Sequence, residues 1–497
     1  MSPALQNPIA HGADVELGSD ATARIEAARD VVERAVAENR TVYGVTTGFG
    51  SLANERVEPS QADALQDGIV RSHATAVGRP LSRQEARAML LLRAHVLALG
   101  HSGVRPVVVR RMVEMLNRDL IPVVPEQGSL GASGDLAPLA NLALPLLGRG
   151  ELLVDEGRVP AGPALEAVGL EPLGLKAKEG LALVNGTQGM LAIGILAVDR
   201  AERLARTADV TAAMSIEAAL GSDAVFDARL TALRPHAGVV ASTSNLRKLL
   251  DGSPIVASHR ESTHLVQDAY SLRCTPQVNG ATREMLRFVR GVLEVEANAV
   301  SDNPIVFPDD DEVLSGGNFH GQPVAVALDA LAASLVPLAS IAERRLYRLL
   351  DPVRNNGLPP FLVAESGLNS GFMLVQYTAA SLVSESKSLA HPASVDSIGS
   401  SAGQEDHVSM GMTAARHARE VVSNAEVVIA LEALVAAQAL DLRAPLDPAT
   451  PTKAAHDAIR EVVPFLETDR EFGPDIASVT ELVRSGVLIE AAGTPLD

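Results

Sequence analysis

Five long stretches of the chain have apolar residues at helical spacing, and they limit the folds that the chain can adopt. They cover residues 188–220, 281–299, 324–350, 370–390 and 408–440. In each stretch, apolar side chains recur every three or four residues and so lie on one face of a helix. The stretches are longer than the mean helix of a globular protein, which has about 11–12 residues. We therefore expect a long helical bundle, shared between subunits.

The composition fits a core of closely packed helices. Hydrophobic residues make up 47% of the 497-residue chain, yet it has only nine Phe, four Tyr and no Trp. The core must then be built from Leu, Ala and Val, which favour helices that approach closely. A chain of this length should form two or three packed regions rather than one small core. The sequence thus predicts a mainly α protein.

The first 200 residues have a more mixed pattern. Helices are expected over residues 20–39, 82–99 and 105–118. The second of these should start with a capping box formed by Ser82 and Glu85 and should end at Gly100. We expect a loop over residues 126–136, which are rich in small side chains, and small strands or turns over residues 152–172.

These patterns divide the chain near residue 200. An N-terminal region of mixed α/β structure, residues 1–200, contains the Gly-rich turn that begins at Tyr43 and the small-residue loop over residues 126–136. Residues 201–497 contain the long-helix bundle and the C-terminal region. We find no internal repeat and no low-complexity linker between the two.

Charge and cysteine content exclude several classes of protein. The formal net charge of −19 leaves no excess of Lys and Arg to neutralise phosphates, so we expect no nucleic-acid partner. Cys274 is the only cysteine, which rules out an intrachain disulfide. The N-terminus has no basic region followed by an apolar run, and apolar stretches such as residues 427–440 are interrupted by Glu432. The expectation is a cytoplasmic protein without a membrane segment.

Several loops between the helices contain aromatic residues next to glycines. The aromatic residues in these loops are Tyr43, Phe49, Tyr270, Phe307 and Phe319. Helical periodicity does not account for them, and loops on a rigid scaffold often carry function. For any single residue the alternative is an aromatic side chain that covers the end of a helix. For the group, a functional site is the stronger interpretation.

Three small residues, Ala132, Ser133 and Gly134, lie at the centre of the loop over residues 126–136. One interpretation is an ordinary turn in which Ser133 or Asp135 caps a helix that begins at Leu136. The other is chemical: in a compressed loop, the nitrogen of Gly134 attacks the carbonyl carbon of Ala132. Loss of two waters, one from the Ser133 hydroxyl, would then give an electrophilic methylidene-imidazolone ring. The residues alone leave both interpretations open.

The segment over residues 131–139, with the sequence GASGDLAPL, resembles the prosthetic-group segment of the ammonia-lyase and aminomutase family. This family includes histidine, phenylalanine and tyrosine ammonia-lyases. Further matching motifs lie at residues 43–50, 179–188, 267–274, 301–304, 317–321 and 404–410. The resemblance extends from about residue 43 to about residue 440. Several ordered motifs over most of one chain are a strong signal.

The resemblance implies a fold, a prosthetic group and an assembly. The fold would be mainly α, of the fumarase/aspartase-like ammonia-lyase type, with a long central helical bundle. Ala132, Ser133 and Gly134 would form 4-methylidene-imidazol-5-one, and no external cofactor or metal would be needed. The subunits would form a homotetramer whose active sites combine residues of more than one chain, and the ligand would be a small amino acid.

The resemblance also assigns roles to individual residues. Tyr43 matches the catalytic base, which removes the weakly acidic β-proton of the substrate. A free tyrosine has a pKa of about 10, so the site must favour the phenolate or form it when substrate binds. Arg273 would pair with the substrate carboxylate. The other expected contacts are Asn185 and Tyr270 with the ring and the substrate, Gln267 near the carboxylate, and Phe319 beside the ring.

Two residues favour L-histidine as the substrate and trans-urocanate as the product. His73, followed by Ala74, resembles the position that histidine ammonia-lyases use to meet the imidazole. Glu405 stands where phenylalanine-type relatives have an amide, and an acid there can hydrogen-bond the imidazole. Departures from the commonest histidine-enzyme pattern occur at Thr46, Ala76, Asn141 and Gly403. They leave tyrosine, phenylalanine or another aromatic amino acid as alternatives.

Three other classes of protein remain as alternatives. A metal enzyme could use ligand types such as Asp302, His320, Glu405, Asp406 and His407, but their spacing fits no compact metal motif. A non-catalytic bundle could keep the fold without the activity. An aminomutase would share the chemistry but add the ammonia back at the β-carbon. A carbon–nitrogen lyase is the function that the sequence favours over all three.

Overall fold

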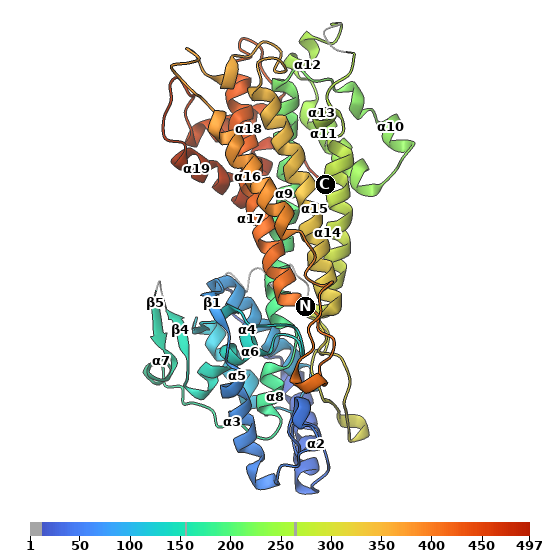
Figure 1. Ribbon diagram of the computed structural model, residues 1–497, viewed down its shortest axis with the longest axis vertical. Coiled ribbons are helices and arrows are strands. Elements are labelled where there is room, and N and C mark those ends of the chain that lie inside the picture. Colours follow the sequence, from blue (N-terminus) through green and yellow to red (C-terminus); the bar gives the residue numbers. More distant parts are fainter. Residues whose placement is uncertain (1–11, 155–156, 263–265) are drawn as a thin grey trace. The chain divides into compact units, whose positions relative to one another are not determined.

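The computed structural model describes residues 12–154, 157–262 and 266–497 and is mainly α-helical (Figure 1). The chain forms two compact units, and each is built from three separate segments. The first unit contains Met1–Leu196, Arg290–Asp329 and Pro392–Arg416, and the second contains Ala197–Val289, Ala330–His391 and His417–Asp497. The predicted domain boundary near residue 200 stays a prediction.

The first unit contains short helices and small sheets. Its helical elements are α2 (Ser19–Ala37), η1 (Gly50–Leu52), η2 (Pro59–Gln61), α3 (Ala62–His73), α4 (Arg83–Ala98), α5 (Pro106–Asn117), α6 (Leu136–Ala143), η3 (Leu144–Leu147), α7 (Ala161–Ala167), α8 (Glu179–Val184), η5 (Pro308–Asp310) and η7 (Ser401–Gly403). Its strands are β1 (Val77–Pro80), β2 (Ile121–Pro122), β3 (Pro125–Gln127), β4 (Glu151–Val154), β5 (Gly157–Pro160), β6 (Ile305–Phe307) and β7 (Glu312–Leu314). They pair antiparallel as β1–β3, β2–β4–β5 and β6–β7.

Four long helices contribute residues to both units: α9 (Gln188–Ala218), α14 (Thr275–Ala297), α15 (Gln322–Leu350) and α17 (Gly411–Asp441). The second unit also contains η4 (Ala224–Phe226), α10 (Ala228–Ala232), α11 (Ala237–Leu250), α12 (Pro254–Ser258), α13 (Tyr270–Arg273), η6 (Pro360–Leu362), α16 (Met373–Leu389), α18 (Thr450–Val462), α19 (Gly473–Ser485) and α20 (Val487–Ala492). The mainly α fold that the sequence predicts is confirmed.

The predicted helices agree with the observed ones to within a few residues at most ends. The capping box at the start of α4 is present: the Ser82 side chain accepts from the Glu85 amide, and the Glu85 carboxylate accepts from the Ser82 amide. Two predictions need correction. β3 occupies the start of the predicted loop over residues 126–136, and α7 was not predicted. α7 is only seven residues long and contains a glycine and a proline, which hide its helical pattern.

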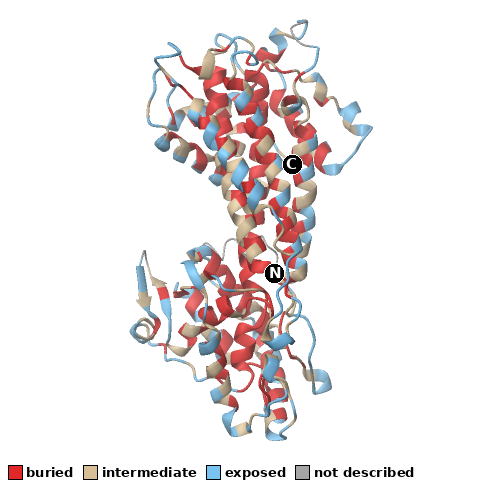
Figure 2. Ribbon diagram, in the orientation of Figure 1, coloured by how far each residue is buried: buried red, intermediate tan, exposed pale blue. Residues whose placement is uncertain are grey.

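Buried residues concentrate on the long helices (Figure 2). Small and branched apolar side chains fill the part of α17 that lies in the second unit, as the scarcity of aromatics predicts. Glu432, which interrupts the apolar stretch of α17, is fully buried and ion-paired with Arg345, with 3.0 Å between Oε2 and Nη2. Thr211 and Ser215 also donate to its carboxylate. These three partners compensate the cost of burying the Glu432 charge.

One helix contradicts the expectation that no apolar stretch could span a bilayer. Of the described residues, α15 alone has the length and composition to cross a membrane, with a mean hydropathy of 2.0 over its most apolar window. Within that window, 61% of the residues are buried inside the protein. A core helix of a globular protein passes the same test, so the length and hydropathy of α15 are weak evidence for a membrane segment.

Candidate active site

Residues from distant parts of the sequence meet around a cavity of about 710 Å³ in the first unit. Six of the predicted site residues line it: Tyr43, His73, Ser133, Asn185, Phe319 and Glu405. The rest of the wall is formed by Phe49, Gly50, Ser51, Leu52, Ala53, Ile69, Ser72, Leu136, Leu181, Asn303, Ser315, Gly316, Ser401 and Gln404. Loops and helix ends supply most of these side chains, as loop-borne sites on helical scaffolds usually do.

The segment of Ala132, Ser133 and Gly134 lies between two cavities. Ser133 lines the larger one, whereas Ala132 and Gly134 line a smaller one of about 220 Å³. His73 and Glu405 contribute to the walls of both. The Ser133 side chain is therefore accessible from the cavity that also holds Tyr43.

Hydrogen bonds to Gly186 fix the same segment at the end of α8. The Gly186 amide donates to the Ser133 carbonyl at 3.3 Å, and the Asp135 amide donates to the Gly186 carbonyl at 2.6 Å. Gly134 has a φ of +73°, and a β-carbon on it would lie 2.0 Å from the Gly186 carbonyl oxygen. Only glycine fits this position. The loop is thus held tightly against a second backbone segment.

The Asp135 carboxylate caps α9 rather than the helix that follows it. Asp135 is the N-cap residue of α6, but its side chain makes no capping hydrogen bond there. Its Oδ2 instead accepts from the Met190 amide at 2.8 Å, and its Oδ1 accepts from the Ser129 hydroxyl at 3.0 Å. Complete burial raises the pKa of Asp135 to about 6, although these hydrogen bonds oppose the rise. The cap ties the small-residue loop to the start of α9.

Tyr43 receives a backbone hydrogen bond at its phenol oxygen. The Gly50 amide donates to Tyr43 Oη at 2.9 Å. Burial raises the pKa of Tyr43, the Gly50 amide lowers it, and the charge of Glu405 raises it further, so that the pKa is raised on balance. The substrate-free chain therefore does not favour the phenolate.

His73 and Glu405 contribute titratable side chains to the cavity wall. His73 ends α3, and its Nδ1 lies 3.0 Å from the Ser72 hydroxyl. Burial lowers the pKa of His73 on balance, despite a raising contribution from Glu405, so the ring is neutral at pH 7. The Glu405 carboxylate accepts from the Ser400 hydroxyl at 2.8 Å. The cavity thus offers one neutral imidazole and one carboxylate to a polar ring.

The Asn185 carboxamide is oriented by groups below the cavity. Its Nδ2 donates to the Asn303 carbonyl at 2.9 Å, while its Oδ1 is buried and has no partner. Asp302, beside Asn303, is ion-paired with Lys178 at 2.9 Å, and both side chains are completely buried. The amide is fixed at its nitrogen, and its oxygen remains a free acceptor on a residue that lines the cavity.

The chain is similar to known proteins over nearly its whole length. The sequence matches the family model for aromatic amino acid lyases over residues 4–461. The chain belongs to the aromatic amino acid lyase family. It is 54% identical to the histidine ammonia-lyase of Symbiobacterium thermophilum over 98% of this chain and 96% of that protein. The crystal structure of histidine ammonia-lyase from Trypanosoma cruzi matches with a TM-score of 0.91 and 44% identity, over 99% of this chain and 93% of that one.

An aminomutase is also similar in structure. Tyrosine aminomutase from Streptomyces globisporus matches with a TM-score of 0.94 and 38% identity, over 100% of this chain and 98% of that one. Lyases and aminomutases thus share this fold within the aromatic amino acid lyase family. The family that the motifs predict is confirmed, and the family's fold agrees with the predicted one.

Three predicted site residues line neither of the two cavities. Gln267, Tyr270 and Arg273 belong to the second unit, around α13. Tyr270 is 71% exposed, and the Arg273 guanidinium lies over its ring at 4.6 Å from the centroid. The Arg273 Nε donates to the Asp268 carbonyl at 3.0 Å. Within this aromatic amino acid lyase chain, these residues form a separate, largely exposed group.

The structure adds two residues that sequence reasoning missed. The Gly50 amide contacts Tyr43, and the Ser401 hydroxyl accepts from the Ser51 amide at 3.0 Å. Ser401 and its neighbour Ala402 have positive φ angles of 48° and 54°. Nothing in the residue types Ser and Ala signals a left-handed backbone, so this turn could not have been predicted from the sequence.

The residues of the loop fit the prosthetic group of the family. The close approach of Gly134 to Gly186 leaves room for a glycine only, and Ser133 opens onto the cavity with the Asn185 oxygen unpartnered. A ring made from this segment would therefore be held by backbone contacts on one side and exposed on the other. In the described part of the chain, no three His, Cys, Asp or Glu side chains are grouped as a metal site would require.

Proposed function

We propose that this chain is a histidine ammonia-lyase, a carbon–nitrogen lyase that converts L-histidine into trans-urocanate and ammonia. The observation that carries the proposal is the shared cavity of Tyr43, Ser133, His73 and Glu405. It brings a potential base, a ring-forming serine and two partners for an imidazole to one place. The high identity to histidine ammonia-lyases supports the same substrate.

Ala132, Ser133 and Gly134 form 4-methylidene-imidazol-5-one in this proposal. The group supplies an electrophile that converts the substrate amine into a better leaving group. The chain's own contribution is to hold the segment compressed. Ser133 and Asp135, the residues on either side of Gly134, are both hydrogen-bonded to Gly186, which fixes the backbone around Gly134. No external cofactor and no metal enter the scheme.

Tyr43 removes the β-proton of the substrate. Because burial and Glu405 raise the pKa of Tyr43, deprotonation must be coupled to the arrival of the substrate and its positive charge. The Gly50 amide supplies a fixed hydrogen bond that favours the phenolate oxygen over the phenol. Asn185 offers its free Oδ1 to the donors of the substrate amine.

His73 and Glu405 select the imidazole. A neutral imidazole substrate has one N–H donor and one nitrogen acceptor. The Glu405 carboxylate accepts the donor, and the neutral His73 ring, whose pKa is lowered by burial, can complement either nitrogen. A phenyl ring has no N–H group to donate to the Glu405 carboxylate, which disfavours phenylalanine. Phe319 lines the same cavity as an apolar surface for the ring.

Assembly completes the site. Arg273 and Gln267 are the proposed contacts to the substrate carboxylate, and Tyr270 is a proposed contact to the prosthetic ring and the substrate. All three lie outside the cavity of their own chain. We propose that they enter the cavity of a neighbouring subunit in a homotetramer. The exposed Tyr270 ring and the planar guanidinium of Arg273 suit this role. We further propose that the enzyme works in the cytoplasm and has amino acids, rather than nucleic acids or membranes, as its ligands.

The test is incubation of the purified protein with L-histidine, L-tyrosine and L-phenylalanine in separate reactions. Formation of a conjugated acid is followed by near-ultraviolet absorbance, and β-amino acids are sought by chromatography. We expect urocanate from histidine at the highest kcat/KM. A β-amino acid as the main product would indicate an aminomutase. No product, together with no ring absorbance, would indicate a non-catalytic bundle, and loss of activity on chelation would indicate a metal enzyme.

Variants test the substrate assignment separately from the chemistry. Glu405→Gln and His73→Phe should lower kcat/KM for histidine relative to that for tyrosine and phenylalanine. Ser133→Ala should remove both the ring absorbance and the activity with every substrate. If the substrate ratios are unchanged in the first two variants, the proposed imidazole contacts are wrong even if the enzyme is a lyase.

A further inference from the structure

The turn at η7 has an unusual backbone for its sequence. The Gly403 amide donates to the Ser400 carbonyl at 3.0 Å and closes a tight turn, and both central residues, Ser401 and Ala402, have positive φ angles. Turns of this kind normally have Asn and Gly at these positions. Strain at residues such as Ser and Ala persists only where the surroundings impose it, and it is often found at functional sites.

The turn holds the backbone next to Tyr43. The Ser401 hydroxyl accepts from the Ser51 amide at 3.0 Å, and the preceding amide, that of Gly50, donates to Tyr43 Oη at 2.9 Å. The successive amides of Gly50 and Ser51 thus donate to two different hydroxyl oxygens, those of Tyr43 and Ser401. A β-carbon on Gly50 would lie 2.5 Å from Ser401 Oγ, which shows how closely the turn packs on this peptide.

We propose that Ser401 is a positioning residue for the base: by holding the Ser51 amide, it keeps the Gly50 amide directed at the Tyr43 oxygen. The inference rests on the proposed function, in which Tyr43 removes the proton. A preorganised donor stabilises developing negative charge without rearranging during the reaction. Ser401 acts through the backbone of Gly50 and Ser51, and the hydroxyl rather than the turn alone is the active element.

The charges around Tyr43 explain why this amide matters. His73 and Glu405 are the other titratable residues that line the cavity. Burial and the Glu405 charge both raise the pKa of Tyr43, while the Gly50 amide is the group that lowers it. If the amide turns away, only contributions that oppose the phenolate remain. Glu405 is anchored independently by the Ser400 hydroxyl, so loss of the Ser401 hydroxyl removes no direct contact to it.

The test compares three variants of the full-length protein. Ser401→Ala removes the hydroxyl, and Ser401→Gly also removes it while relieving the positive-φ strain. Ser397→Ala is the matched control, because its hydroxyl accepts from the Val408 amide at 3.0 Å in the same segment but does not contact residues 49–53. For each variant, the pH profile of kcat/KM with L-histidine, the ring absorbance, and a spectroscopic tyrosinate titration against a Tyr43→Phe reference are recorded.

We expect both Ser401 variants to keep the ring absorbance, with KM changed less than kcat. Their kcat should fall by about tenfold or more, the loss expected for a hydrogen bond to a charged group. The base pKa in the profile and in the Tyr43 titration should rise by about one unit. Ser397→Ala should match the wild type in both profiles.

Two results would overturn the inference. One is a Tyr43 titration in Ser401→Gly that coincides with that of the wild type. The other is an equal loss of kcat in Ser401→Ala and Ser397→Ala with unchanged pH profiles, which would mean that the segment is only structural. If the wild type makes no urocanate, the proposed function fails, but the tyrosinate titration still decides whether Ser401 controls Tyr43.

Discussion

A β-carbon on Gly134 would lie 2.0 Å from the carbonyl oxygen of Gly186. The two glycines are far apart in the sequence, and the end of α8 brings the second one to the loop that carries the first. Hydrogen bonds from the Asp135 amide and to the Ser133 carbonyl make Gly186 the partner of the whole segment. The backbone, rather than any side chain, therefore sets the compression on which ring formation depends.

Gly134→Ala should prevent ring formation and destabilise the protein. Gly169→Ala is the matched control, because Gly169 has the same φ of +73° but no atom within 4 Å of the added β-carbon. The unfolding free energy of the Gly169→Ala control should fall by only about 1–2 kcal/mol, the cost of an alanine in the left-handed backbone conformation. Gly134→Ala should lose more, since overpacking adds about 1–3 kcal/mol. Chemical denaturation and ring absorbance measure the two effects.

The comparison separates two causes that both involve Gly134. If the two variants are destabilised equally, the backbone angle alone is responsible and the contact with Gly186 can relax. If Gly134→Ala shows normal ring absorbance, the close contact is not needed for cyclisation, and the account of the compressed loop is wrong.

Much of this fold could be predicted because its signals are local. Apolar periodicity located the long helices, and Ser82 with Glu85 located the start of α4. Sequence motifs predict Tyr43, Ser133 and Asn185, among others, as site residues. They do not predict how these side chains come together around one cavity. The left-handed turn at Ser401 and the orientation of the Gly50 amide arise from tertiary packing, which residue types do not encode locally.

Tyr43→Phe should abolish turnover without affecting the ring. General-base catalysis usually contributes about 10²–10⁴-fold, and we expect kcat to fall by that factor. Near-ultraviolet absorbance should remain, because Tyr43 takes no part in cyclisation as proposed. Tyr377→Phe, on the exposed face of α16, provides a control for the chemical change. A Tyr43→Phe enzyme with nearly normal kcat would show that another group removes the proton.

Lys178→Met should destabilise the first unit strongly. The substitution leaves Asp302 as a completely buried charge without its ion-pair partner, a change that typically costs about 3–5 kcal/mol. The double variant Lys178→Met with Asp302→Asn should recover part of this loss, because no unpaired charge remains while the amide can still accept from Asn303. A double-mutant cycle of unfolding free energies measures the coupling. Additive effects of the two substitutions on the unfolding free energy would exclude an energetic coupling between Lys178 and Asp302.

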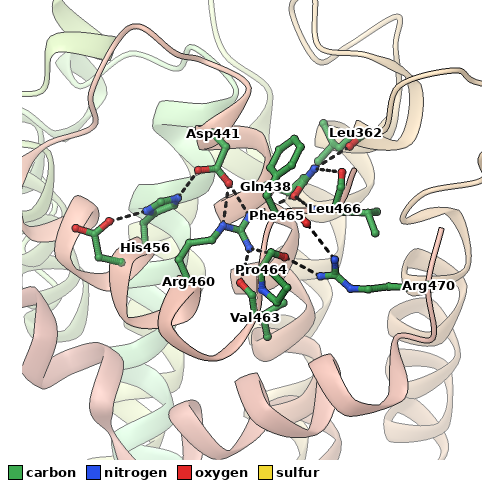
Figure 3. A network of polar contacts seen from close by, with 11 residues as sticks. Leu362, Gln438, Asp441, His456, Arg460, Val463, Pro464, Phe465, Leu466 and Arg470 are labelled. Atoms are coloured by element: carbon green, nitrogen blue, oxygen red, sulfur yellow. Dashed lines mark hydrogen bonds and ion pairs between the residues drawn. The ribbon is translucent and has the colours of Figure 1, made fainter. Parts of the chain in front are cut away.

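The stability of the second unit should depend on the charge of His456. Its Nε2 lies 2.7 Å from Asp441 Oδ1 and its Nδ1 2.9 Å from Asp457 Oδ1, with Arg460 also on Asp441 (Figure 3). Burial lowers the pKa of His456, but the hydrogen bonds and charge of these aspartates outweigh it, and the pKa is raised above 6.5. The stabilisation is therefore complete below pH 6.5 and lost as the pH rises through the higher, folded-state pKa.

His456→Gln tests this dependence by chemical denaturation across pH. The pKa of Asp441 is lowered from 3.8, because its hydrogen bonds and charge contacts with His456 and Arg460 outweigh burial, so its contribution is lost at the acid end. The difference in stability between wild type and variant should be largest between about pH 4 and 6.5 and smaller above that range. A constant difference from pH 5 to 9 would show that the network does not depend on the His456 proton.

Mixed assemblies can decide whether active sites are shared between chains. Tyr43 lines the cavity and Arg273 does not, so a shared site would take these two residues from different subunits. Tyr43→Phe and Arg273→Gln should each be nearly inactive alone. When the two variants are co-expressed and assemble at random, about one quarter of the sites should have both native residues and regain activity.

The control for this experiment is a mixture of the two variants that were purified separately and not allowed to exchange subunits. It should stay inactive, because each assembly then lacks one of the two residues at every site. If Tyr43 and Arg273 act within one chain, every chain in the co-expressed sample has one defect, and activity stays at the level of the separate variants. Recovery only on co-assembly thus requires that Arg273 reaches the cavity of another subunit, which its half-buried position beside the exposed Tyr270 ring allows.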